Sequence, residues 1–208
     1  VGTTAFVMKL AEEGLIHFAL LLTRNQIDSE NPENVVPAWL IYASVAGFYG
    51  LCGGIMTTYW GPGASGSGVA ELVGYLNGVN YPDFLSVPSL VTKIVGVTFA
   101  VGGKLCVGKE GPLAHIGAVI GAACLYIPGL GLEHLQNDDE KRLIIAAGAS
   151  CGVSVAFGAP IGGALFCYEL SKPNTFWKFQ MIWKVFFACC VGVFVMAMWS
   201  GISKQDWI

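Results

Sequence analysis

The chain has 208 residues, of which 54% are hydrophobic and 12% are charged, and its formal net charge is −3. Soluble domains carry about 25% charged residues, so this composition excludes an ordinary soluble domain. It predicts an all-α protein that crosses a membrane several times. The small negative charge gives no indication of nucleic-acid binding.

Long uncharged stretches support this interpretation. Residues 34–70, 143–168 and 185–203 contain no Asp, Glu, Lys or Arg. A helix of about 20 apolar residues is enough to cross the hydrocarbon core of a bilayer, which is roughly 30 Å thick. We therefore expect an integral, multi-pass protein in a lipid bilayer, with its charges in loops and at the ends of segments.

In chain order, a first helix is predicted over residues 1–23 and a polar, acidic loop over 24–37. A second apolar helix is predicted over residues 36–60, and its glycines offer a small-residue face for close contact between helices. The following residues, 61–68 (GPGASGSG), break the apolar pattern. The helical segment after this break, 69–79, is too short to cross a bilayer.

Two further breaks interrupt the apolar pattern, at residues 108–112 (GKEGP) and 157–160 (FGAP). Glycine and proline are the residues that most often end or kink a helix. The remaining helices are predicted over residues 89–106, 113–127, 143–156, 161–170 and 176–200. Three interrupted segments are therefore expected among the membrane helices.

Interrupted backbone at membrane depth is tolerated where it is buried in protein or lines a watery cavity. A helix that starts there directs unpaired amides and a partial positive charge towards an anion. We expect the three helix starts, after Ser67, Glu110 and Phe157, to face one point and to bind an anion weakly enough to release it. The candidate anion-binding residues at the breaks are Gly66, Ser67, Gly68, Gly108, Lys109, Gly111, Phe157, Gly158 and Ala159.

Glu110 is the prime candidate for a functional side chain. After it, the chain has no Asp, Glu, Lys or Arg until Glu133. An unpaired charge in lipid costs about 3 kcal/mol or more, so an acid beside so long an apolar stretch marks a functional site. The alternative is a carboxylate that caps a helix at the membrane interface, and Ser67 has a similar alternative as a capping residue.

Three strings carry a family resemblance: GSGVAELVGYLNGV from Gly66, GKEGPLAHIGA from Gly108 and FGAPIGGALFCYEL from Phe157. In this order and spacing, they resemble the CLC family of chloride channels and chloride/proton exchangers. The resemblance implies that Ser67 contacts the central chloride and that Glu110 is a gate, which occupies an anion position and swings aside when protonated.

The resemblance has two departures. Ala70 stands where the family usually has a proline after the serine motif. Leu170 stands where the exchangers carry their inner proton-transfer glutamate, although the preceding acid is present as Glu169. Leu170 cannot carry a proton, which favours a channel over an exchanger, while Glu169 is either a buried structural acid or part of a proton path.

The resemblance further implies a CLC-type fold of tilted and broken transmembrane helices. We expect residues 1–208 to be a partial transmembrane domain, the first of two inverted repeats plus the start of the second, without the second half or any cytosolic domains. The family also implies a homodimer, to which helices 161–170 and 176–200 contribute contacts. The expected partners are chloride, protons, a second subunit and lipid, and no cofactor beyond a bound chloride ion is expected.

The function predicted for the complete protein is a chloride channel that responds to voltage and pH through Glu110. The serious alternative is a chloride/proton antiporter. A soluble nucleotide-binding enzyme is disfavoured because no Lys-Ser or Lys-Thr pair follows the glycines of 61–68, so the protein is not expected to be an enzyme. A non-transporting structural membrane subunit is disfavoured by Ser67 and Glu110.

Other polar and aromatic residues receive structural interpretations. His115 is expected to hydrogen-bond a neighbouring loop, Lys109 to set the local potential, and the histidines to bind no metal. The tryptophans Trp177, Trp183, Trp199 and Trp207 are expected to anchor the protein at the membrane interface. The cysteines are expected to be small buried side chains rather than a disulfide framework; they are Cys52, Cys106, Cys124, Cys151, Cys167, Cys189 and Cys190.

Overall fold

The computed structural model describes residues 1–27, 35–127, 137–171 and 181–205, and within these ranges its regular secondary structure is helical. The first helices are α1 (Gly2–Ile27), α2 (Val35–Tyr59), the short 3-10 turn η2 (Pro62–Ala64) and α3 (Val69–Leu76). They are followed by α4 (Val87–Gly102), α5 (Glu110–Cys124), α6 (Asp138–Phe157), α7 (Pro160–Ser171) and α8 (Met181–Gln205). The expected all-α class is confirmed for the described residues.

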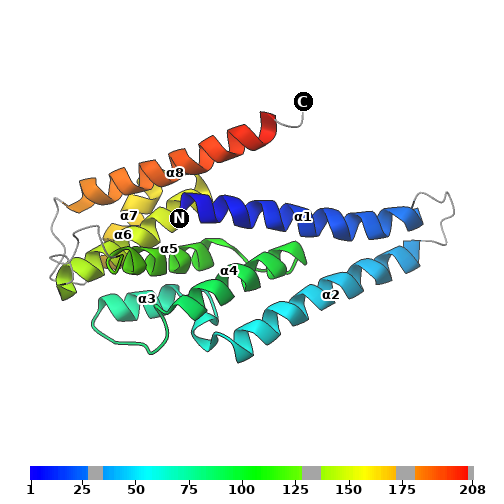
Figure 1. Ribbon diagram of the computed structural model, residues 1–208, viewed down its shortest axis with the longest axis horizontal. Helices are drawn as coiled ribbons and strands as arrows, with labels where there is room; N and C mark the ends of the chain where they lie inside the picture. Colours follow the sequence, from blue (N-terminus) through cyan, green and yellow to red (C-terminus); the bar gives the residue numbers. More distant parts are fainter. Residues whose placement is uncertain (28–34, 128–136, 172–180, 206–208) are drawn as a thin grey trace.

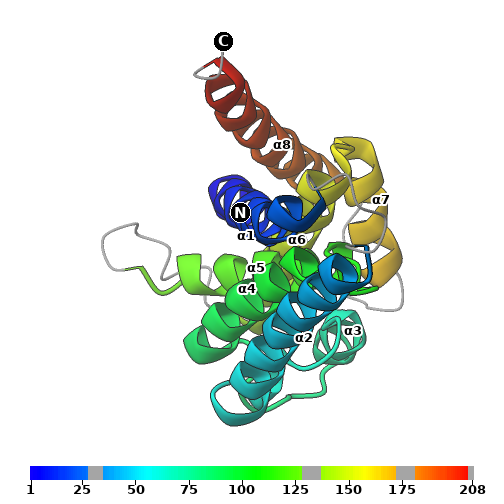
Figure 2. The ribbon, with the colours of Figure 1, turned by 90° about the vertical axis from the view of Figure 1, so that its right-hand side faces the viewer.

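Helix α5 lies in the middle of the bundle, with α8 and α2 at opposite edges (Figures 1 and 2). Its contact with α6 is a direct approach of two backbones. A Cβ atom on Gly117 would collide with the carbonyl oxygen of Gly148, and a Cβ atom on Gly148 would collide with that of Gly117. Small residues permit such close packing between membrane helices, so these glycines allow the close approach of α5 to α6.

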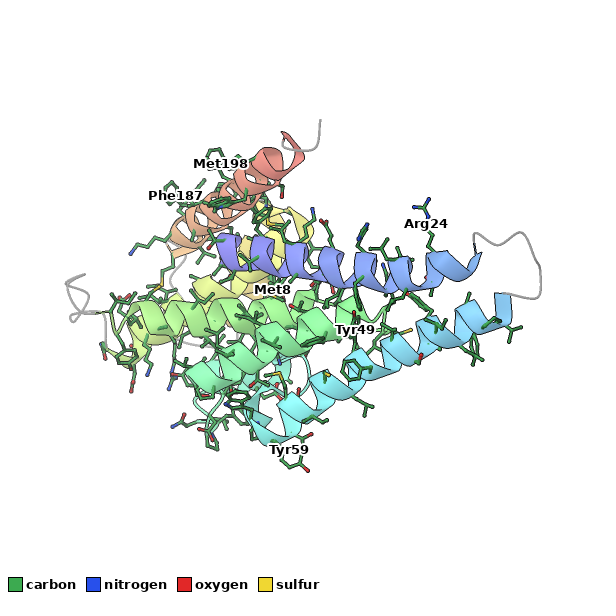
Figure 3. All side chains as sticks on the ribbon, turned by 45° about the vertical axis from the view of Figure 1, so that its right-hand side comes forward. Met8, Arg24, Tyr49, Tyr59, Phe187 and Met198 are labelled. Carbon is green, nitrogen blue, oxygen red and sulfur yellow. The ribbon has the colours of Figure 1, made fainter. Side chains whose placement is uncertain are left out.

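Among the described residues, two helices are long and apolar enough to cross a membrane: Val36–Tyr59, with 24 residues, and Met181–Ile202, with 22. Only 6% and 17% of their respective apolar windows is buried. Figure 3 shows Phe187 and Met198 on the outward side of α8, whereas Met8 and Tyr49 lie inside the bundle. Their exposed fractions agree, at 71% and 50% for the outer pair and 3% and 5% for the inner pair.

Several predicted boundaries are corrected by the structure. Helix α1 continues to Ile27 and α2 begins at Val35, so the loop expected over residues 24–37 is shorter. Helix α6 begins at Asp138 instead of residue 143, since Asp138, Asp139 and Glu140 form its first turn, where acids interact favourably with the helix dipole. Trp177, Trp207, Glu133 and His134 lie outside the described residues.

The cysteine prediction is only partly correct. Cys151, Cys167 and Cys189 are buried, but Cys106 and Cys124 are exposed. The reason is the helix boundaries: α4 ends at Gly102, which leaves Cys106 in the loop before α5, and Cys124 is the last residue of α5. All seven cysteines are free thiols.

Candidate functional site

The first break places a serine between two left-handed glycines. Gly66 and Gly68 have φ angles of +67° and +83°, a region that glycine enters without steric cost. Gly68 precedes the first residue of α3, and the Ser67 hydroxyl oxygen accepts a hydrogen bond from the Val69 amide at 3.3 Å. Ser67 therefore helps to cap α3, as the alternative interpretation of this residue expected.

The second break contacts the first. A Cβ atom on Gly111, in the first turn of α5, would lie 2.8 Å from the Ser67 Cβ. The Glu110 carboxylate folds back so close to Gly108 that a Cβ atom there would collide with its Oε2. Glycine at these two positions therefore makes room for the serine and for the carboxylate.

The two breaks share a cavity of about 410 Å³, lined by Gly66, Ser67, Gly108 and Pro112 together with residues of α2 and α4. Among the described residues, no hydrogen bond engages the amide of Ser67, Gly108 or Gly111. Amides that are free at a helix start, where the dipole is positive, are anion-binding groups. These amides are therefore groups with which the cavity can bind a small anion.

Lys93 on α4 is a site residue that our sequence reasoning missed. It is 3% exposed, and its ammonium donates hydrogen bonds to the carbonyl oxygens of Ala64 (2.9 Å) and Gly66 (2.8 Å). It also lines the cavity. The sequence does contain a signal for this residue, because Lys93 is the only charged residue between Asp83 and Lys104.

The third break does not join this cavity. Phe157, Gly158 and Ala159 are exposed and do not line it. Gly158 is left-handed, with φ +66°, and the amides of Gly158 and Ala159 both donate to the Ser154 carbonyl. This arrangement closes the C-terminus of α6, so the structure brings together two of the three expected helix starts.

Lys109 points away from the cavity that its neighbours line. Its Nζ atom is 3.7 Å from Oε2 of Glu12 on α1, and the Lys109 side chain is 40% exposed. A second, smaller cavity, of about 200 Å³, is lined by both residues and by Val155 and Ala156 of α6. In this conformation Lys109 is placed to influence the local potential, not to contact an ion in the larger cavity.

Glu169 and Leu170 occupy different environments on α7. Glu169 is exposed, so its interpretation as a buried structural acid is wrong. Leu170 is 7% exposed and belongs to the apolar core with Cys167 and Val185. An apolar core residue therefore stands at the position that the resemblance assigned to proton transfer.

His115 has the structural role that was expected of it. It is 1% exposed, its Nε2–H donates to the Phe84 carbonyl at 2.8 Å, and its ring stacks on that of Phe84 at 4.2 Å. A Cβ atom on Gly68 would lie 2.6 Å from the His115 Nδ1. The imidazole ring therefore packs directly against the first break at Gly68.

Comparisons with known proteins agree on one family. The family model for voltage gated chloride channels matches residues 49–205. Chloride channel protein A of Dictyostelium discoideum is 35% identical over 201 residues, which is 93% of this chain and 23% of that protein. The human H(+)/Cl(-) exchange transporter 7 is 34% identical over 203 residues, or 94% of this chain and 25% of that protein.

A crystal structure of a eukaryotic CLC transporter superposes with a TM-score of 0.81 at 25% identity, covering 95% of this chain and 35% of that one. A slow cyanobacterial Cl-/H+ antiporter gives a TM-score of 0.80 at 24% identity and shows the same fold. The chain thus spans about a quarter of the length of these two curated relatives. With its helices arranged as in CLC transporters, it belongs to the voltage gated chloride channel (CLC) family of integral membrane proteins.

Proposed function

We propose that the complete protein transports chloride across a membrane and that the cavity between the first two breaks is part of the pathway. The observation that carries this proposal is the contact between Ser67 and Gly111, which brings two helix starts to one cavity. Unbonded amides carry only partial positive charge, and the Lys93 ammonium in the cavity lining is already bound by two carbonyls, so the ion can be bound and still released. Names of relatives that include chloride channels and chloride exchangers support the same substrate.

We further propose that Glu110 is the gate. Its carboxylate does not line the cavity but lies against Gly108, which does, so we expect rotation of the side chain to bring it to the same amides that would hold chloride. The carboxylate and chloride then compete, and protonation of Glu110 removes the competitor. Because a charge that crosses the membrane field gains or loses about 2.3 kcal/mol per 100 mV, this competition gives sensitivity to voltage as well as to pH.

A channel is the mechanism that Leu170 favours. Its side chain is buried among apolar residues and cannot relay a proton. The second candidate is chloride/proton exchange, favoured by the human relative named as an exchange transporter and by Glu169, an exposed acid that can take up protons. The two mechanisms differ in whether chloride movement drives protons against their gradient.

We also propose a homodimer in which the outer faces of α7 and α8 form the contact. Ile161, Leu165 and Trp183 are 66%, 54% and 70% exposed and border one apolar groove of about 360 Å³. Large exposed apolar surfaces on a membrane protein are covered by lipid or by another protein. The family resemblance favours a second copy of the subunit.

The test is a flux measurement on the complete protein in liposomes with a chloride gradient and a pH-sensitive dye inside. Rapid chloride flux with constant internal pH is expected for a channel. Proton movement against its own gradient would establish the exchanger instead. Liposomes in which the purified, folded protein moves no chloride at all would contradict the proposal.

A further inference from the structure

The Glu12 carboxylate is a buried charge that the proposed pathway does not use. Glu12 lies on α1, and its side chain is 6% exposed. A single acid in the apolar interior of a membrane protein costs about 3 kcal/mol or more unless it has a partner. Its partner is Lys109, whose Nζ is 3.7 Å from the Glu12 Oε2.

Lys109 lies between two cavities. Val107, Gly108 and Pro112, its neighbours in the chain, line the cavity with Ser67. Lys109 itself lines the smaller cavity with Glu12, on the α1 side of the α5 start. The lysine side chain is long and flexible, so its direction is decided by what attracts its ammonium group.

We propose that Glu12 is a positioning residue for the anion site: it holds the Lys109 ammonium in the smaller cavity, so that no second ammonium joins that of Lys93, which is held by the Ala64 and Gly66 carbonyls. This inference rests on the proposed function. A second full positive charge within a few ångströms of the ion, added to that of Lys93, would bind the ion more tightly at low dielectric, and an ion held tightly leaves slowly. Glu12 therefore favours fast turnover.

The neighbouring charges do not substitute for Glu12. Lys9 lines the same cavity, but its ammonium is 3.9 Å from Glu13, and their side chains are 39% and 61% exposed. Exposed pairs of this kind interact weakly because water screens them. Glu13, the next residue on the same helix, is thus a natural control for Glu12.

The experiment measures chloride flux against chloride concentration for the complete protein in liposomes. Glu12→Gln should lower the half-saturating chloride concentration about threefold to tenfold and lower the maximal rate, because a freed lysine turns towards the ion. Glu13→Gln should leave both values unchanged. The double variant Glu12→Gln, Lys109→Met should have the same half-saturating chloride concentration as Lys109→Met alone.

The proposal is overturned if Glu12→Gln leaves the half-saturating concentration unchanged, or if the same shift persists in the Lys109→Met background. Should Glu12→Gln fail to fold, Glu12→Asp keeps the charge on a shorter chain and is expected to shift the concentration about twofold in the same direction; no shift would count against the proposal. A crystal structure of the variant provides a readout independent of transport. If Lys109 turns towards Ser67 in the variant, the positioning role is supported, and if Lys109 does not move, it is contradicted. This readout holds even if the unmodified protein is shown not to transport chloride.

Discussion

The first and third breaks look alike in sequence and in backbone, yet only the first lines the candidate anion cavity. Gly66 and Gly158 have φ angles of +67° and +66°, and a Cβ atom on either would meet no atom within 4 Å. At the third break, the two amides after Phe157 donate to the Ser154 carbonyl. At the first break, the Ser67 amide has no partner among the described residues and a second helix start faces it. We therefore expect an interrupted helix to form an anion site where its donors stay free and another interruption closes the cavity.

Lys93 explains part of this difference. Its ammonium binds the carbonyl oxygens of Ala64 and Gly66, which are the acceptors of the first break. With those carbonyls turned towards a buried cation, the amides of the same turn are left for the cavity. The structure shows no buried lysine at the third break in the part of the chain that it describes.

The largest expected effect comes from Lys93→Met. Methionine is similar in length but donates no hydrogen bond, so a buried carbonyl loses its partner at about 1–3 kcal/mol, and the second carbonyl adds to this cost. Thermal unfolding of the complete protein in detergent should show the loss, and chloride binding should weaken. Lys9→Met, at a half-exposed pair, should cost under about 1 kcal/mol. Equal losses in the two variants would show that Lys93 does not hold the first break.

Glu110→Gln tests the contribution of the second break, which carries the proposed gate. Glutamine has the shape of the protonated acid, so flux should rise, by about tenfold for a gain of 1.4 kcal/mol, and should no longer increase as pH falls. Flux of the unmodified protein should rise with acidity, because protonation removes the competing charge. Stopped-flow flux measurements over a range of pH provide the comparison, with Glu13→Gln as the control. A pH response that survives in Glu110→Gln would remove Glu110 from the gate.

The smallest effect on stability is expected when Gly66 and Gly158, which have matching backbone conformations, are each replaced by alanine. This pair also compares the first and third breaks most directly. Gly66→Ala and Gly158→Ala each force a left-handed conformation on alanine, at about 1 kcal/mol, and the space around both positions is open. Their losses of stability should therefore be similar. Calorimetric titration should nevertheless show weaker chloride binding for Gly66→Ala alone. Equal effects on binding would mean that the two breaks do not differ in function.

Much of the fold was predictable because its signals are local. Glycine, serine and proline mark the breaks at residues 61–68, 108–112 and 157–160, and each lies at a helix end in the structure. The packing of Ser67 against Gly111 is not local, since it depends on how α3 and α5 meet in space. Composition alone therefore does not distinguish the third break from the other two.

For the charged residues too, the sequence indicates which ones matter but not which groups they contact. Glu110 was identified from an acid beside an apolar stretch, and the same rule applied to Lys93 would have found it within its uncharged surroundings. Its acceptors, the carbonyls of the first break, are not visible in sequence. The Glu12 to Lys109 pair joins α1 to the start of α5, so it requires the tertiary arrangement as well.

The most direct test of the account is anomalous diffraction from crystals of the complete protein grown with bromide in place of chloride. Bromide scatters anomalously and carries the same charge, so it reports the anion position itself. We expect a peak in the cavity between Ser67 and Gly108, and no peak beside Phe157, Gly158 and Ala159. A peak at the third break, or none between the first two, would contradict the claim that two facing interruptions form the anion site.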